Sequence, residues 1–80
     1  MTREEIVSKI EPIAQKVFMQ PSLVIDDNLS AATVPTWTSL TFTQFLTELE
    51  GLFAIKFKMM EILKMKNMGA IIDTVVSHLK

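Results

Sequence analysis

The chain offers few side chains that could do chemistry, and the most suggestive is a serine in the stretch Trp37-Thr38-Ser39-Leu40. Ser39 stands directly before a strongly apolar, periodic segment, where the first residue of a helix is expected. Backbone amides at a helix start have no partner within the helix, and the helix dipole favours negative charge there. A phosphate esterified to the Ser39 hydroxyl would therefore be stabilised without a dedicated basic side chain.

Other reactive groups are scarce. The chain has no cysteine, which excludes disulfides and thiolate metal sites. The only histidine, His78, is expected to be a solvated residue at a helix end, because a basic side chain suits a helix C-terminus. The two glycines, Gly51 and Gly69, form no phosphate loop, and no nucleophile elbow surrounds a serine. A Ser-His-Asp hydrolase remains a weak hypothesis. We expect no metal site and no enzymatic activity.

Composition narrows the function classes further. The chain has 80 residues, which predicts one domain, residues 1–80. Its hydrophobic share of 49% is enough for a single core. The formal net charge of −1 argues against an electrostatic nucleic-acid binder. No apolar run approaches the roughly 18–20 residues of a membrane span, and the first residues, MTREEIVSKI, contain no signal-peptide core. We therefore expect a soluble, cytoplasmic monomer.

The first helix is predicted to open at Thr2, which forms a T-x-x-E capping box with Glu5. Apolar residues then recur at helical spacing: Ile6, Ile10, Ile13, Ala14, Val17 and Phe18. Pro12 falls inside this pattern and should kink or split the helix, because it removes the bond to the Ser8 carbonyl. The segment 20–22, Gln-Pro-Ser, is expected to end the element.

A long connection, residues 21–37, follows; it contains apolar residues and must therefore pack over the core. A second helix is predicted from Ser39 to Phe53, capped by Thr38, with a stripe of Phe42, Phe45, Leu46, Leu49, Leu52 and Phe53. Residues 58–65 suggest a short helix. Asn67 caps a last helix whose core face holds Met68, Ile71, Ile72, Val75, Val76 and Leu79. The six methionines are expected to fill irregular core space.

These elements predict an all-α fold, a four-helix bundle of three long helices and one short one, with a long loop between the first two. At about 100° per residue, Leu40 lies nearly opposite the apolar stripe of the second helix. An apolar side chain that is turned outward beside an exposed serine suits a docking surface. The alternative is that Leu40 lies under the long loop and that Ser39 merely starts a helix.

The whole chain resembles the acyl carrier proteins and the related peptidyl carrier domains. Their signature is Asp-Ser-Leu, often preceded by tryptophan; here Trp37, Ser39 and Leu40 match, and Thr38 takes the aspartate position. The segment FLTELEGLFAIKF, residues 45–57, resembles the family's continuation, with matches at Leu49, Glu50, Phe53 and Ile55. The segment MKNMGAIIDTVVSHL resembles the family's final helix, with Met68, Ile71, Ile72 and Val75 at its packing positions.

The resemblance implies a four-helix carrier fold in which Ser39 bears phosphopantetheine through a phosphodiester. A phosphopantetheinyl transferase adds the group from coenzyme A, and its thiol holds an acyl or aminoacyl cargo as a thioester. The expected partners are that transferase, an acyl- or aminoacyl-activating enzyme, and a downstream acyltransferase or synthase of a lipid, polyketide, peptide or cell-envelope pathway. The partner-binding residues are expected around the serine: Trp37, Thr38, Leu40, Thr43 and Gln44.

The sequence departs from the family pattern at three points. Thr38 caps the helix but lacks the charge that modifying enzymes usually meet, so modification is expected to be slow or to need a particular transferase. No residue from 28 to 47 is charged, so recognition should depend little on salt. Ala54 replaces a glycine that would end the second helix in a left-handed conformation, at a cost of roughly 1–2 kcal/mol if that conformation is kept. A carrier-like fold without the prosthetic group, acting as a protein-interaction module, is the alternative.

Overall fold

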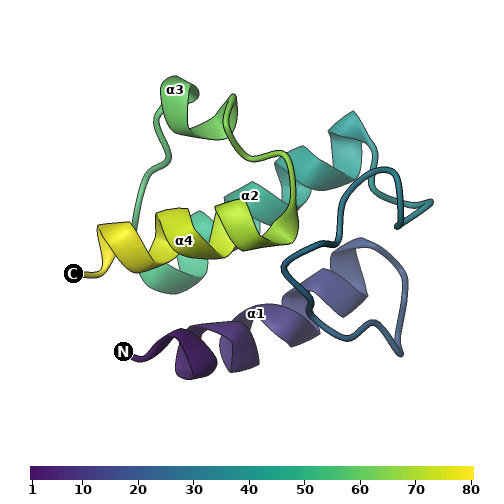
Figure 1. Ribbon diagram of the computed structural model, residues 1–80, viewed down its shortest axis with the longest axis horizontal. Helices are drawn as coiled ribbons and strands as arrows, with labels where there is room; N and C mark the ends of the chain where they lie inside the picture. Colours follow the sequence, from purple (N-terminus) through teal and green to yellow (C-terminus); the bar gives the residue numbers. More distant parts are fainter.

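The computed structural model describes all 80 residues, which form four α-helices and no strand (Figure 1). The first helix, α1 (Arg3–Val17), begins at the predicted capping box. Thr2 Oγ1 accepts a hydrogen bond from the Glu5 amide at 3.1 Å, and Glu5 Oε1 accepts one from the Thr2 amide at 2.8 Å. The Thr2 backbone amide holds the pKa of the Glu5 carboxyl below its usual value.

Pro12 was predicted to kink or split the first helix; α1 continues through it, so the helix is not split. Pro12 lies on the exposed side of the helix, where water can satisfy the Ser8 carbonyl, while Ile6, Ile10 and Ala14 are buried on the opposite side. The helix ends at Val17, before the predicted stop at residues 20–22. Met19 takes a left-handed conformation with φ of 54° and turns the chain away.

The long loop between α1 and the second helix, α2 (Ser39–Phe53), packs over the core, as predicted. Val34 is buried, and Leu23, Ile25 and Leu29 contact the core from the loop. Side chains of α1 hold the loop backbone, since Gln15 Nε2 donates to the Leu23 carbonyl at 2.9 Å and the Ile25 amide donates to Glu11 Oε2 at 2.9 Å. This fixes the path of the chain into α2.

The start of the last helix, α4 (Met68–His78), holds the other side of the loop. The Met68 amide donates to the Leu29 carbonyl at 2.8 Å, and the Gly69 amide donates to the Asp27 carbonyl at 3.0 Å. A Cβ atom at position 69 would lie 2.9 Å from the Asp27 Cβ, so only glycine permits this approach. Arg3 adds ion pairs to Asp27, at 2.9 Å, and to Asp73.

Helix α2 (Ser39–Phe53) has the predicted bounds, and α4 (Met68–His78) starts at the predicted cap, where Asn67 Oδ1 accepts from the Ala70 amide at 2.9 Å. Between them lies one turn, α3 (Met59–Ile62). Helix α1 packs against both α2 and α4 (Figure 1). The fifteen core residues are Ile6, Ile10, Ala14, Phe18, Val34, Phe45, Leu46, Leu49, Phe53, Phe57, Met65, Met68, Ile71, Ile72 and Val75.

Two expectations about the core are wrong. Leu52 was expected in the buried stripe of α2 but is 44% exposed, because helical periodicity gives the direction of a side chain and not whether a neighbour covers it. Only two of the six methionines, Met65 and Met68, fill core space. The other four are exposed: Met1, Met19, Met59 and Met60. None of the helices is long and apolar enough to cross a membrane.

Candidate functional site at the start of α2

Ser39 is the first residue of α2, and its side chain is exposed. Its hydroxyl makes no hydrogen bond within the chain; the Thr43 hydroxyl donates instead to the Ser39 carbonyl oxygen at 2.8 Å. The serine oxygen is therefore free to react, and it is held at the end of a helix of 15 residues. A group attached here would have a rigid point of origin on a packed scaffold.

The preceding residue, Thr38, caps α2 as predicted. Thr38 Oγ1 accepts from the Thr41 amide at 3.2 Å, and Thr41 Oγ1 accepts from the Thr38 amide at 2.8 Å. Thr41 thus takes the third helical position, where a capping box usually has glutamate or glutamine. The buried Thr41 hydroxyl also lies 2.6 Å from the Thr36 carbonyl, which anchors the loop to the helix.

This cap leaves the amides of Ser39 and Leu40 without a partner in the chain. No acidic side chain lies in the first turn of α2 to repel an anion. The free amides and the positive end of the helix dipole therefore favour an anionic group on Ser39. The sequence predicted these unpaired amides correctly from the position of the serine.

A shallow depression of about 440 Å³ lies beside Ser39. Its lining joins the start of α2 to the segment before α4: Ala31, Trp37, Thr38, Ser39, Phe42, Met65 and Lys66. Lys66 brings a positive charge to the surroundings of the serine, and Met65 brings an apolar wall. Neither was expected there, because they follow Ser39 by 27 and 26 residues and no local pattern signals such a contact.

Leu40 points outward, as predicted, with 68% of its surface exposed. Together with Thr43 and Gln44 it borders a second groove, of about 610 Å³, between α1 and α2. Lys16 and Glu48 also line this groove and form an ion pair at 3.4 Å. The structure thus brings three of the predicted partner-binding residues together at one groove, which also holds the Lys16–Glu48 ion pair.

Trp37, the remaining predicted contact, is half-buried. Its ring stacks on Phe18, with centroids 5.1 Å apart, and on Phe42, with centroids 6.0 Å apart. These contacts give Trp37 a packing role that joins the end of α1 to the start of α2. Trp37 also lines the depression beside Ser39.

His78 is not a solvated residue, contrary to the expectation. It is half-buried, its Nε2 lies 3.0 Å from Glu61 Oε1, and its ring meets the Phe57 ring edge-on at 5.8 Å. The histidine therefore belongs to the contact between α3 and α4 and lines neither hollow near Ser39.

Comparisons of the chain with protein-family models, curated proteins and solved structures found no match.

Proposed function

We propose that the protein is a carrier of the acyl carrier type, a non-enzymatic four-helix bundle that bears phosphopantetheine on Ser39. The observation that carries the proposal is the free, exposed hydroxyl at the first residue of α2, beside two unpaired backbone amides. The resemblance of the sequence around residues 37–40, 45–57 and 65–79 supports the same assignment. The whole protein then serves to present one reactive arm.

The residues around Ser39 fit such a group. The amides of Ser39 and Leu40 would hold the phosphate, and Lys66 would add a positive charge from across the depression. Trp37 and Met65 offer an apolar wall to the part of the arm nearest the protein. When bound, the group supplies a flexible thiol that carries the acyl or aminoacyl cargo as a thioester.

Attachment of phosphopantetheine would require only a nucleophile from this chain. Ser39 Oγ forms a bond to phosphorus, the bond between the two phosphates of coenzyme A breaks, and adenosine 3′,5′-bisphosphate leaves. The hydroxyl proton would go to a base of the transferase, because no carboxylate or histidine lines the depression beside Ser39. Ser39 thus supplies the nucleophile, and the α2 start supplies a favourable place for the product's negative charge.

The partners follow from this role: a phosphopantetheinyl transferase, an activating enzyme that loads the cargo, and an acyltransferase or synthase that receives it. Leu40, Thr43 and Gln44 form the uncharged surface that such partners would contact. Tethering raises the effective concentration of the cargo at each partner. We place the protein in the cytoplasm, where coenzyme A is available.

A second candidate is a protein-interaction module of the same fold that no longer carries the group. The observation that favours it is Thr38, which caps the helix without the charge of the aspartate usual in carriers. Incubation of the purified protein with coenzyme A and a broad-specificity transferase separates the two, with intact mass as the readout. A gain of one phosphopantetheine group supports the carrier; an unchanged mass with several transferases supports the module.

A further inference from the structure

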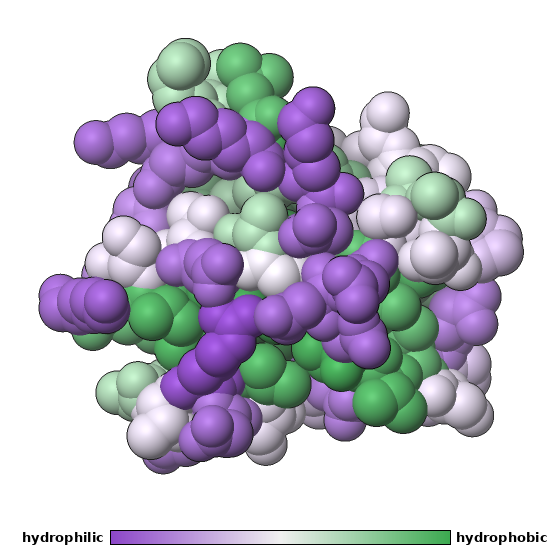
Figure 2. Space-filling view, viewed as in Figure 1, coloured by the Kyte–Doolittle hydropathy of each residue, from purple (hydrophilic) through white to green (hydrophobic).

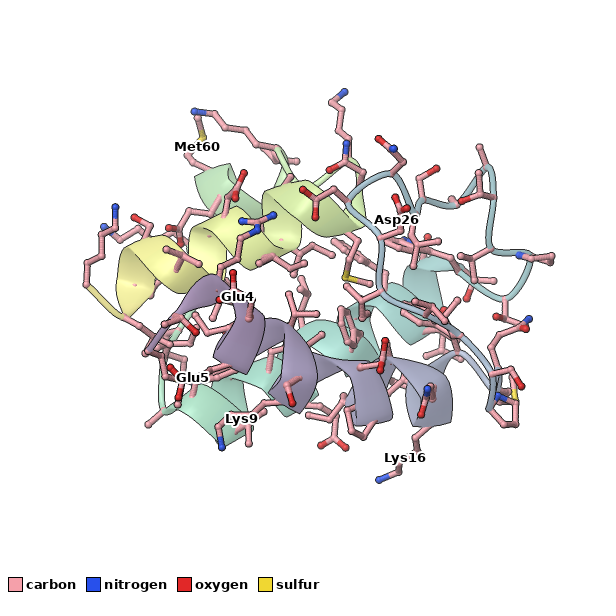
Figure 3. The ribbon with its side chains drawn as sticks, turned by 60° about the horizontal axis from the view of Figure 1, so that its bottom comes forward. Glu4, Glu5, Lys9, Lys16, Asp26 and Met60 are labelled. Atoms are coloured by element: carbon pink, nitrogen blue, oxygen red, sulfur yellow. The ribbon has the colours of Figure 1, made fainter.

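The short helix α3 carries an exposed apolar face. Met59, Met60 and Leu63 are 68%, 66% and 64% exposed, and α3 contributes no buried residue to the core. Positions 59 and 63, and positions 60 and 63, are neighbours on a helical turn, so the three side chains share one face. Figure 2 shows hydrophobic surface at the top of the molecule, over α3, and Figure 3 shows Met60 projecting away from the ribbon.

Lysines flank this face on both sides. Lys56 and Lys58 precede α3 and Lys64 follows it, and all three are exposed. We call these three lysines, together with Met59, Met60 and Leu63, the α3 patch. None of the three lysines belongs to an ion pair of the chain. Their ammonium groups are therefore available to an outside partner.

The nearest acids are already engaged within the protein. Glu61, the only acid between residues 56 and 66, accepts from the Lys58 amide at 2.7 Å and contacts His78. Glu50 Oε2 accepts from the Phe57 amide at 2.8 Å. Residues 56–66 thus carry a net charge of +3 in a chain whose total is −1, with Lys66 turned to the depression beside Ser39.

The α3 patch is a protruding surface. Helix α3 lies at the top of the view, beyond α4 and away from α1 (Figure 1), and of the patch residues only Lys56 lines one of the hollows of the molecule. The buried residues Phe57 and Met65 anchor the segment on either side. Three apolar side chains are therefore held outward on a fixed support, with positive charges around them.

We propose that the α3 patch binds the surface of an anionic lipid membrane. Its apolar side chains would enter the boundary between headgroups and acyl chains, and its lysines would contact lipid phosphates, with their apolar stems along the surface. This inference is independent of the proposed modification of Ser39, because it uses neither the serine nor its surroundings.

A membrane fits the α3 patch better than an acidic protein does. All three cations are lysines, which act as point charges, whereas arginine provides the planar fork that pairs two-to-two with carboxylates. A protruding tip of three apolar side chains is also small beside the roughly 800 Å² that each partner buries in a stable protein interface. A lipid membrane is deformable and uniformly charged, so binding to it requires neither shape complementarity nor a large contact area.

The test is co-sedimentation of the full chain with lipid vesicles. Binding is expected to phosphatidylcholine vesicles with about one third phosphatidylglycerol, and it should be strongly reduced for pure phosphatidylcholine. Raising the salt from about 0.1 M to about 0.5 M should weaken binding several-fold. The double variant Lys58→Gln/Lys64→Gln should lose about 20–30-fold in affinity, and Met60→Ser/Leu63→Ser at least about tenfold.

Matched controls come from elsewhere on the surface. Met19→Ser/Val24→Ser removes two apolar side chains of similar exposure, 69% and 71%, and Lys9→Gln/Lys80→Gln removes two exposed charges outside the α3 patch. Both should bind vesicles like the wild type. Equal binding to neutral and anionic vesicles, or equal losses in patch and control variants, would overturn the proposal. So would binding to polyglutamate in the absence of any binding to vesicles, which would identify an acidic protein as the partner.

Discussion

His78 and Glu61 tie the last helix to the shortest one. His78 Nε2 lies 3.0 Å from Glu61 Oε1, and the same oxygen accepts from the Lys58 amide at 2.7 Å. Helix α3 has four residues, none fully buried, and of its apolar side chains only Ile62 packs against the core, so little of its own packing holds it in place. The Glu61 carboxylate therefore joins α4 to the start of α3, and the edge-on contact between His78 and Phe57 supports the same connection.

Replacing Glu61 by glutamine should reduce the loss of stability in acid. The Lys58 amide, and then His78, hold the pKa of Glu61 below its ordinary value of 4.5. A carboxyl whose pKa is lowered by folding stabilises the fold fully above its unfolded-state pKa. This stability is lost as pH falls through the folded-state pKa. The melting temperature of Glu61→Gln, followed by Trp37 fluorescence, should therefore fall less than that of the wild type below pH 4.5.

The control for this prediction is Glu4→Gln, which removes an exposed carboxylate without a hydrogen bond in the chain. Its melting temperature should fall with pH as that of the wild type does. Glu5, whose pKa is lowered by the Thr2 amide, will keep part of the acid sensitivity in every variant. Identical pH profiles for Glu61→Gln and the wild type would show that the carboxylate does not brace α3.

Near the end of α2, an alanine stands where the backbone favours glycine, and a glycine stands where the helix favours alanine. Ala54 holds the left-handed conformation, with φ of 54° and ψ of 47°, whereas Gly51 lies inside the helix with open space around its Cβ position. Ala54→Gly should stabilise the fold by about 1 kcal/mol, and Gly51→Ala by about 0.5–1 kcal/mol. Denaturant midpoints measure both changes.

The contrasting variant is Gly69→Ala, which should destabilise because its Cβ would meet Asp27. If Ala54→Gly leaves the midpoint unchanged, the left-handed cap costs nothing and the strain assigned to it does not exist.

The fold should depend on the aromatic side chains that α2 buries. Phe45 is fully buried, so Phe45→Ala should cost about 3–5 kcal/mol, a large part of the stability of so small a domain. Leu52→Ala, on the same helix but 44% exposed, should cost far less. Thermal melts followed by circular dichroism compare the two. Equal costs would mean that the burial described for α2 is incorrect.

Thr38→Asp should speed modification of Ser39. Aspartate can replace threonine as the cap, so stability should change by less than about 1 kcal/mol, and the added carboxylate restores a charge that a basic transferase surface can pair with. The rates of group transfer to wild type and variant are compared at low and high salt. The advantage of the variant should shrink as salt rises; equal rates at both ionic strengths would show that Thr38 is only a neutral cap.

The sequence was sufficient where a local signal marks the structure. The cap at Thr38 and the apolar period after it predicted α2 with its correct bounds, and Asn67 did the same for the start of α4. The Gln-Pro-Ser signal at residues 20–22 placed the end of α1 too late, because the turn begins at Met19, in a left-handed conformation that methionine does not favour. Pro12 gave a misleading signal, because burial of one face of α1 outweighs one lost hydrogen bond.

Contacts between distant residues were beyond sequence reasoning. The pairing of His78 with Glu61 and the position of Lys66 beside Ser39 join different elements, and hydrophobic periodicity says nothing about either. The prediction that the methionines fill core space was likewise wrong for four of the six, since a flexible apolar side chain suits a core and an exposed binding surface equally well. The position of Ser39 was predictable because helix starts have a local signature.

The most direct test of the carrier assignment is to locate the modification on the chain. Wild type, Ser39→Ala and the matched variant Ser77→Ala are incubated with coenzyme A and a phosphopantetheinyl transferase, and each product is measured by intact mass and peptide fragmentation. Both Ser39 and Ser77 are exposed, and Thr38 keeps the α2 cap in the alanine variant, so all three proteins should be equally helical. Wild type and Ser77→Ala should gain one phosphopantetheine group on Ser39, and Ser39→Ala should gain none. A full mass gain in Ser39→Ala, or none in the wild type with any transferase, would contradict the assignment.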